Sequence, residues 1–211
     1  MRTALIADIH GNFGGLLAVI ADIGFQQCDR VVCLGDLVNG GEENIAVVRY
    51  IRENRIPCMM GNHEEINNAQ LPPDLCMFMA SLPEDIIEGD VIFTHISPRP
   101  KRQKINSAVE AWNVFDETRY RLAFVGHTHY PVIFGEKTPE PVSATEYPFE
   151  YGVPFRLASD DRYIIVVAPV GYSRDGCDKP RYAIYDNRCG TVEMRAVPGP
   201  LLSIDYATTN E

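Results

Sequence analysis

Histidine is rare in this chain, and each of its five histidines stands in a short polar motif. The motifs, with one aspartate motif among them, are Asp8-Ile9-His10, Gly35-Asp36, Gly61-Asn62-His63-Glu64, Thr94-His95 and Gly126-His127-Thr128-His129. Histidine is a common metal ligand and the usual side chain for proton transfer near neutral pH. These motifs can form one site only in a fold that brings residues 8 to 129 together, and this requirement limits the fold strongly.

The first third of the chain predicts a parallel sheet. Apolar runs typical of buried strands alternate with apolar residues at helical spacing. We expect strands at residues 3–7, 31–34 and 56–60, with helices around residues 16–23 and 45–51 between them. In α/β proteins of this order, ligands bind at the carboxyl ends of the strands. The motifs with Asp8, Asp36 and Asn62 follow the three strands directly.

The remainder predicts two more helices, at residues 75–82 and 108–118, and two strands that lead into the later motifs. Those strands cover residues 91–94, before His95, and 122–125, before His127. Further strands are expected at residues 132–134, 163–168, 182–185 and 191–196, in an antiparallel second sheet. Residues 135–154 predict a long loop with a hairpin. We expect a single domain over residues 1–211.

The composition of the chain limits the kinds of molecule that it can bind. The formal net charge of −10 disfavours a non-specific grip on long nucleic acid, which needs Lys and Arg to neutralise phosphates. A small phosphorylated substrate remains compatible, because a metal site supplies its own positive charge. The six cysteines include no C-x-x-C pair, so we expect reduced thiols in a cytoplasmic protein. No apolar run approaches the ~20 residues that span a bilayer, so no membrane partner is expected. The sequence leaves the oligomeric state open.

The donor set matches a dinuclear hydrolytic centre, in which two cations roughly 3.5–4 Å apart brace one phosphorus atom. Asp8, His10 and His129 are candidates for one metal. Asn62, His95 and His127 are candidates for the other, with Asp36 as the bridge and a catalytic residue. Two carboxylates against two dications leave a positive excess of about +2, which favours a phosphate ester. Nitrogen and oxygen ligands without thiolate predict manganese first, with Fe, Zn, Ni, Co or Mg as alternatives, and no organic cofactor is expected.

His63 is the candidate proton donor to the leaving group. It follows the predicted ligand Asn62, and on an extended backbone the two side chains point in opposite directions. Glu64 is a candidate for orienting it.

Together these residues resemble the calcineurin-like metallophosphoesterase superfamily, whose motifs D-x-H, G-D, G-N-H-[DE], H and G-H-x-H all occur here in order. The resemblance implies the same metal ligands, catalytic assistance by His63, and a four-layer αββα sandwich of two mixed sheets flanked by helices. The second motif continues as Leu37-Val38-Asn39-Gly40-Gly41 without the arginine of the phosphoprotein phosphatases. Residues 168–176 and the Tyr130-Pro131 pair after the last histidine motif resemble the small single-domain prokaryotic phosphodiesterases.

The expected function is hydrolysis of small phosphodiesters or phosphomonoesters, with nucleotides among the candidate substrates, by attack of a metal-bound hydroxide on phosphorus. The alternative is a catalytically silent metal-binding scaffold of the same fold that acts as a protein-interaction module. Three smaller features have two interpretations each. The basic residues Arg99, Lys101, Arg102 and Lys104 either steer an anionic substrate or form a solvated loop. Arg174-Asp175 either lies at the active centre or forms a turn salt bridge, and Tyr130 and Tyr172 either stack on a base or pack.

Overall fold

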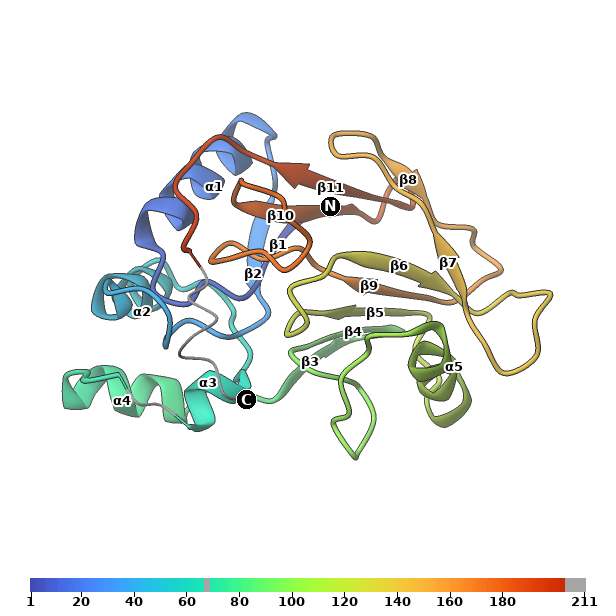
Figure 1. Cartoon of the computed structure of the whole chain (residues 1–211), viewed down its shortest axis with the longest axis horizontal. Helices are drawn as coiled ribbons and strands as arrows, with labels where there is room; N and C mark the ends of the chain where they lie inside the picture. The colour runs from blue at the N-terminus through green and yellow to red at the C-terminus, as the bar shows by residue number, and fades with distance from the viewer. Residues whose placement is uncertain (67–68, 204–211) are drawn as a thin grey trace.

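The computed structural model describes residues 1–66 and 69–203, and it has two mixed β-sheets with helices on their outer faces. Figure 1 shows α1 (Phe13–Phe25) and α2 (Asn44–Glu53) beside the first sheet, and α5 (Ala108–Glu117) beside the second. α4 (Pro73–Ala80) packs with α2. The predicted αββα fold class is therefore confirmed. The predicted single domain extends beyond the described residues and stays a prediction.

The first sheet has the order β2-β1-β10-β11-β8, in which only the β1–β2 pair is parallel. Its strands are β1 (Arg2–Ile6), β2 (Arg30–Cys33), β8 (Phe155–Arg156), β10 (Arg181–Asp186) and β11 (Thr191–Ala196).

The second sheet has the order β3-β4-β5-β9-β6-β7, with β4, β5 and β9 parallel to one another. Its strands are β3 (Asp85–Glu88), β4 (Val91–Thr94), β5 (Leu122–Val125), β6 (Val132–Gly135), β7 (Thr145–Tyr147) and β9 (Tyr163–Val166).

Three expectations about the strands and sheets are wrong. The second sheet is mixed rather than antiparallel, and β10 and β11 belong to the first sheet because β10 pairs with β1. Residues 56–60 form no strand: they make a single parallel bridge, between Cys33 and Cys58, and then enter the short helix α3 (Asn62–Glu65). Periodicity finds apolar runs, but it does not say which distant run supplies the hydrogen-bonding partner.

Alternation along the strands builds three apolar layers. In β1, Ala4 and Ile6 face the layer shared with α1 and α2, while Leu5 faces the layer between the sheets. In β5, Phe124 faces the inter-sheet layer and Ala123 faces α5. Both faces of each central strand are thus buried, which explains their continuous apolar sequences. The carboxyl ends of β1, β2, β4 and β5 meet at the edge of the inter-sheet layer.

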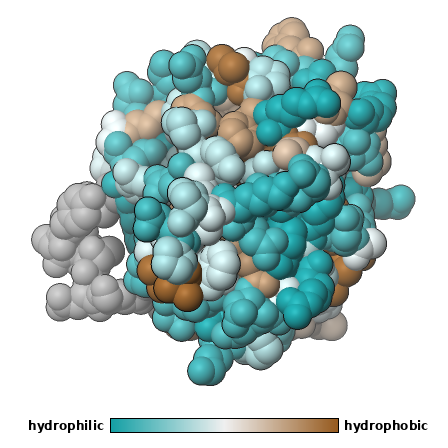
Figure 2. Space-filling view, turned by 90° about the vertical axis from the view of Figure 1, so that its right-hand side faces the viewer, coloured by the Kyte–Doolittle hydropathy of each residue, from teal (hydrophilic) through white to brown (hydrophobic). Residues whose placement is uncertain are grey.

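The surface is mainly polar, as the net charge requires. The face seen in Figure 2 is largely hydrophilic, with small separate hydrophobic spots. Among the described residues, no helix is long and apolar enough to cross a membrane.

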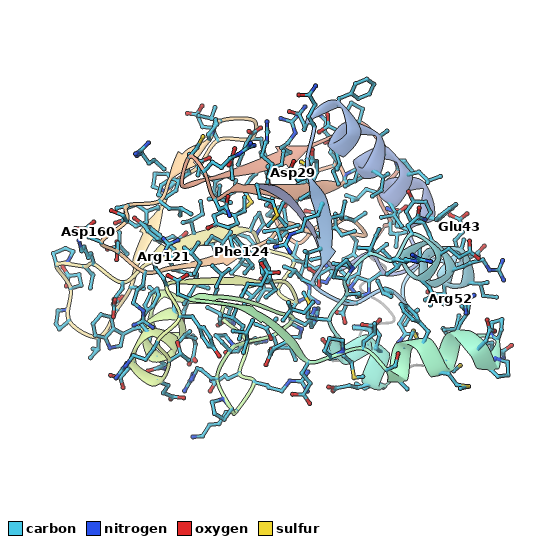
Figure 3. The ribbon with its side chains drawn as sticks, turned by 180° about the vertical axis from the view of Figure 1, so that it is seen from behind. Asp29, Glu43, Arg52, Arg121, Phe124 and Asp160 are labelled. Atoms are coloured by element: carbon cyan, nitrogen blue, oxygen red, sulfur yellow. The ribbon has the colours of Figure 1, made fainter. Side chains whose placement is uncertain are left out.

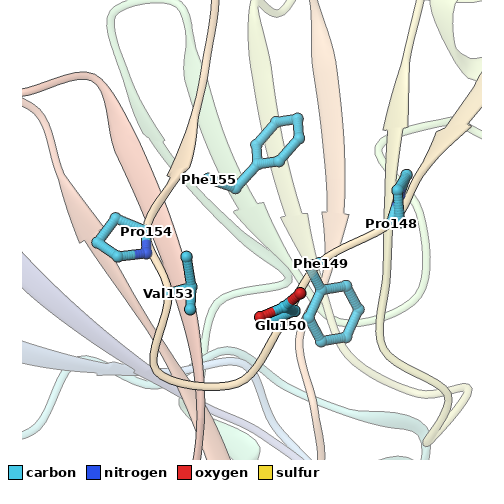
Figure 4. Close-up of a pocket in the computed structure, with 6 residues that line it drawn as sticks. All are labelled: Pro148, Phe149, Glu150, Val153, Pro154 and Phe155. Atoms are coloured by element: carbon cyan, nitrogen blue, oxygen red, sulfur yellow. The ribbon is translucent and has the colours of Figure 1, made fainter.

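The region predicted as a long loop contains β7, which pairs antiparallel with the preceding strand β6 from Gly135–Thr145 to Ile133–Tyr147. Residues 148–155, between β7 and β8, frame a small pocket of about 250 Å³ (Figure 4). None of the predicted site residues lines this pocket, so the functional site lies elsewhere.

Phe124 tests the inter-sheet layer, since its ring is fully buried and stacks on Phe93 at 5.4 Å (Figure 3). Phe124→Ala should lower the free energy of unfolding by about 3–5 kcal/mol, because it leaves a cavity between the sheets. Phe25, 83% exposed, supplies the matched control. Phe25→Ala should stay within about 0.5 kcal/mol of the parent. Urea denaturation measures both, and equal losses would contradict the packing described.

Candidate active site and metal centre

The structure brings all seven predicted metal ligands to one edge of the two sheets. Six of them follow the carboxyl ends of β1, β2, β4 and β5, and the seventh, Asn62, is the first residue of α3. A hydrogen bond joins the two sheets at this point: the backbone N–H of His127 donates to Oδ1 of Asp8 at 2.9 Å. The Gly126 N–H donates to the His95 carbonyl at 2.9 Å, which aligns the second-sheet ligands with each other.

The first ligand group contains Asp8, His10, Asp36 and His129. One potential ligand atom of each residue lies within 4.8 Å of the others. The Nε2 atoms of His10 and His129 are 3.1 Å apart, and His10 Nε2 lies 3.7 Å from Asp36 Oδ2. All four side chains are buried, so this group is a compact nitrogen and oxygen donor set.

The second ligand group contains Asp36 again, with His95, His127 and Asn62. His95 Nε2 lies 3.1 Å from Asp36 Oδ2. The Asn62 side-chain oxygen lies 3.1 Å from His95 Nε2 and 2.8 Å from His127 Nδ1. Asp36 is thus the one residue that belongs to both groups, the position that sequence analysis gave it.

Backbone carbonyls orient three of the histidines. The Nδ1 atoms of His10, His95 and His129 lie 3.1, 2.7 and 3.0 Å from the carbonyl oxygens of Val38, Leu34 and Tyr172. When a ring is neutral and donates from Nδ1 to a carbonyl, its Nε2 lone pair is free for a ligand. This arrangement is common among metal-binding histidines.

The residues present fit a cation. Among the described residues, Oδ2 of the fully buried Asp8 has no hydrogen-bond partner, and such an atom needs one. Burial lowers the pKa of His10 and of His127 to about 4, so both rings are neutral at pH 7, as a metal ligand must be. Burial would also lower the pKa of His95, but the charge of Asp36 raises it to about 10. The cluster therefore attracts positive charge.

The backbone at the site is strained. Asp8, His10, Asp36, His127 and His129 all have positive φ, between 50° and 71°. Non-glycine residues rarely adopt this conformation, because it costs about 1–3 kcal/mol per residue. Residues in such conformations are found mainly at functional sites. His127 and His129 therefore do not lie on extended backbone. The left-handed turns direct them into different ligand groups.

His63 lies at the outer side of the first group. Its ring meets the His10 ring edge-on, with centroids 4.6 Å apart, and its Nε2 is 4.0 Å from Asp36 Oδ2. The ring is partly exposed, as a group that meets substrate must be. The expectation that Asn62 and His63 lie on extended backbone is wrong, because both residues lie in α3.

Glu64 supports Asp36 rather than His63. Its buried carboxylate accepts hydrogen bonds of 2.8 Å from the backbone N–H groups of Asp36, Leu37 and Gly61. Gly61 has to be glycine, since a Cβ there would lie 2.1 Å from Asp36 Oδ1. Glu64 therefore fixes the two loops that carry Asp36 and Asn62. Sequence analysis missed this role, which depends on contacts 27 and 28 residues apart.

Residues 171–175 pack onto the first ligand group. The Gly171 N–H donates to the Asp8 carbonyl at 2.8 Å, and the Tyr172 ring stacks on His129 at 4.1 Å. Tyr172 thus packs against the ligands. Asp175 pairs with Arg181, so there is no Arg174–Asp175 salt bridge.

Arg174 lies near the centre. Burial raises the pKa of Asp8 to about 7, and the charge of Arg174 opposes this rise. Burial and neighbouring histidines lower the pKa values of His127 and His129, and the charge of Arg174 adds to that effect.

The basic residues after His95 divide into two kinds. Arg99 is buried and pairs with Glu110 and Glu117, and Arg102 pairs with Glu65, so both are structural. Lys104 lies in a pocket wall beside His127. The interpretation that the basic residues steer an anionic substrate therefore does not hold for Arg99 and Arg102.

Comparison with known proteins decides the family. The model of the calcineurin-like phosphoesterase family matches residues 1–187. The chain belongs to this family. It is therefore a metallophosphoesterase, a hydrolase whose relatives use divalent metals.

Several relatives are similar over most of the chain. A metallophosphoesterase from Sphaerobacter thermophilus is 29% identical, with a TM-score of 0.82 over 94% of this chain and 89% of the other. An uncharacterized protein of Methanocaldococcus jannaschii is 29% identical over 90% of this chain and 85% of its own length. A symmetrical bis(5′-nucleosyl)-tetraphosphatase of Yersinia pestis is 40% identical, but over only 30% of this chain and 23% of that enzyme.

Metal binding predicts a change in thermal stability. Mn²⁺ at about 100 times its dissociation constant should raise the melting temperature by about 5–10 °C, because it binds only the folded state. Asp36→Asn should abolish this shift, since both ligand groups lose a carboxylate. Glu43→Gln is the control, because Glu43 is exposed and makes no cap hydrogen bond. Differential scanning calorimetry with and without EDTA measures the shift, and an unchanged shift in Asp36→Asn would refute the assignment.

Glu64→Ala should weaken Mn²⁺ binding by about 10–100-fold, because three N–H groups lose their acceptor and Asp36 its support. Glu65→Ala removes an exposed carboxylate from the next position and should leave the affinity unchanged. Isothermal titration calorimetry compares the variants. Similar affinities in both would show that Glu64 does not position the ligands.

Proposed function

We propose that this protein is a dinuclear metal-dependent phosphoesterase that hydrolyses small phosphodiesters or phosphomonoesters. The observation that carries the proposal is the membership of Asp36 in two adjacent ligand groups. A carboxylate has two oxygens and can serve two cations at once. Asp8, His10 and His129 complete one site, and Asn62, His95 and His127 complete the other.

Two divalent cations held here would polarise the phosphoryl oxygens, lower the pKa of water and offset the charge that develops in the transition state. The protein supplies the geometry. Carbonyl acceptors fix the imidazole rings, and Glu64 fixes the backbone of Asp36. Manganese is the metal we expect first for this nitrogen and oxygen set, with Fe, Zn, Ni, Co or Mg as alternatives.

His63 supplies the proton. During hydrolysis the oxygen of water bonds to phosphorus, and the bond between phosphorus and the leaving oxygen breaks. The leaving oxygen takes a proton from the His63 ring and departs as an alcohol. The partly exposed position of His63 beside His10 and Asp36 suits this role, because the ring can reach both the ligand cluster and the substrate.

Nucleotides are the substrate class we favour. The similarity to the tetraphosphatase covers 67 residues, and that enzyme acts on a dinucleoside compound by its name. The formal net charge of −10 disfavours long nucleic acid, whose binding needs Lys and Arg to neutralise phosphates. We further propose a cytoplasmic location, where nucleotides are abundant.

A silent scaffold is the alternative function. Loss of a ligand or of the proton donor would favour it, but the chain contains the complete set. Turnover of any phosphoester with added metal decides between the two.

Replacement of His63 tests the proton donor. A general acid contributes roughly 10²–10⁴-fold when the leaving group is a poor one. His63→Ala should lower kcat for a 2′,3′-cyclic nucleotide, whose leaving group is an alkoxide, far more than kcat for bis(p-nitrophenyl) phosphate. The Mn²⁺ thermal shift should persist in the variant, because His63 is not a ligand.

Glu43→Gln serves as the control and should retain both activities. Equal losses on the two substrates would assign His63 a positional role, and no loss on either would refute the proton-donor assignment.

A further inference from the structure

A second pocket, of about 500 Å³, opens beside the predicted metal ligand His127. Its size falls within the range of sites for small molecules. Its lining comes from the segment after β4, from the turn after β5, from β6 and β7, and from the loop that carries Arg174. It is distinct from the pocket at residues 148–155, which shares no lining residue with it (Figure 4).

The floor of the pocket is apolar and rigid. Ile105, Val132 and Phe134 line it, and each is at most 7% exposed. Tyr130 stands beside them, 55% exposed, although it follows the ligand His129 directly. An exposed aromatic ring next to an apolar floor suits a flat, partly polar ring of a ligand.

The polar groups in the wall restrict that ligand. Glu146 and Asn106 offer a carboxylate and an amide, which can accept and donate hydrogen bonds at the edge of a heterocycle. A carboxylate in the wall disfavours a purely anionic occupant such as inorganic polyphosphate, because like charges repel. The occupant is therefore a ring with N–H or C=O groups.

Two cations line this pocket together with His127, and the charges of both act on that ring. Lys104 and Arg174 line the pocket, and among the described residues neither forms an ion pair. In a chain of net charge −10, two unpaired cations beside a metal centre indicate an anionic group at that place. A phosphate between the metal ligands and the pocket satisfies them.

The pocket and the proton donor serve different arms of the substrate. His63 packs on His10 and does not line the pocket, which begins at His127. The leaving group departs at His63, so the group that enters the pocket is the one that stays on phosphorus. A phosphomonoester has no such group.

We propose that this pocket is a nucleoside subsite, in which Tyr130 stacks on the base and Arg174 holds the scissile phosphate. The enzyme is then a diesterase selective for a nucleoside on the retained arm. This inference rests on the proposed function, and it adds the pocket that binds the nucleoside and the arm of the diester that carries it.

The test uses two diesters that share a leaving group, p-nitrophenyl thymidine 5′-phosphate and methyl p-nitrophenyl phosphate, with Mn²⁺. The same phosphorus–oxygen bond breaks in both, so their ratio of kcat/KM reports the retained arm alone. We expect a preference of about tenfold or more for the thymidine ester, from stacking in the pocket. Tyr130→Ala should reduce this ratio about tenfold.

Two further variants separate the contributions. Arg174→Gln should lower kcat/KM about tenfold for both esters and leave their ratio unchanged, because the phosphate is common to them. Phe25→Ala removes an exposed aromatic ring remote from the sequence motifs and should change neither value.

Calorimetry supplies a readout without turnover. In EDTA, the protein should bind thymidine 5′-monophosphate more tightly than methyl phosphate, and Tyr130→Ala should remove the difference. No hydrolysis of any ester would refute the proposed function, while this titration would still test the pocket. Hydrolysis of both esters at equal kcat/KM, with equal binding of the two phosphates, would overturn the nucleoside subsite alone.

Discussion

The buried carboxylate of Asp36 is the group on which the site depends. It is 1% exposed, and burial by itself would raise its pKa, but the charges of His95, His10 and His63 hold that pKa well below its usual range. A buried anion is costly unless opposite charge compensates it. Histidines from both sheets gather around Asp36, and in the proposed dinuclear centre the same convergence would give two cations a shared ligand.

Holding Asp36 in place requires the backbone around it to adopt unusual conformations. Five ligands have left-handed φ, which the local sequence does not favour. The apolar layers and the hydrogen bonds of Glu64 keep these turns in place, because releasing them would break contacts between elements far apart in the chain. The rigid sheets thus provide the stability that the strained loops lack. This division is common in enzymes, where loops on a rigid scaffold carry the chemistry.

Arg181 shows how the core also shapes the rim of the site. It is completely buried at the start of β10, and it donates to Asp175 and Tyr151. The ion pair anchors the loop that carries Tyr172 and Arg174 to the first sheet. A charge inside the first sheet therefore positions the loop of Arg174, the cation that we propose holds the scissile phosphate.

Much of this protein follows from its sequence by itself. The strand-ending motifs named the candidate ligands that the structure brings together. The apolar periodicity located four helices and most strands, and the order of strands and helices placed Asp8, Asp36 and His95 at strand ends. These features are local, or they follow from the rule that parallel strands end at one edge. Tertiary structure decided the rest: the assignment of β10 and β11 to the first sheet, the left-handed ligand turns, the support by Glu64 and the pocket beside Tyr130. Each depends on contacts between residues distant in sequence, whose geometry is set by packing and by the hydrogen bonds that buried groups must find.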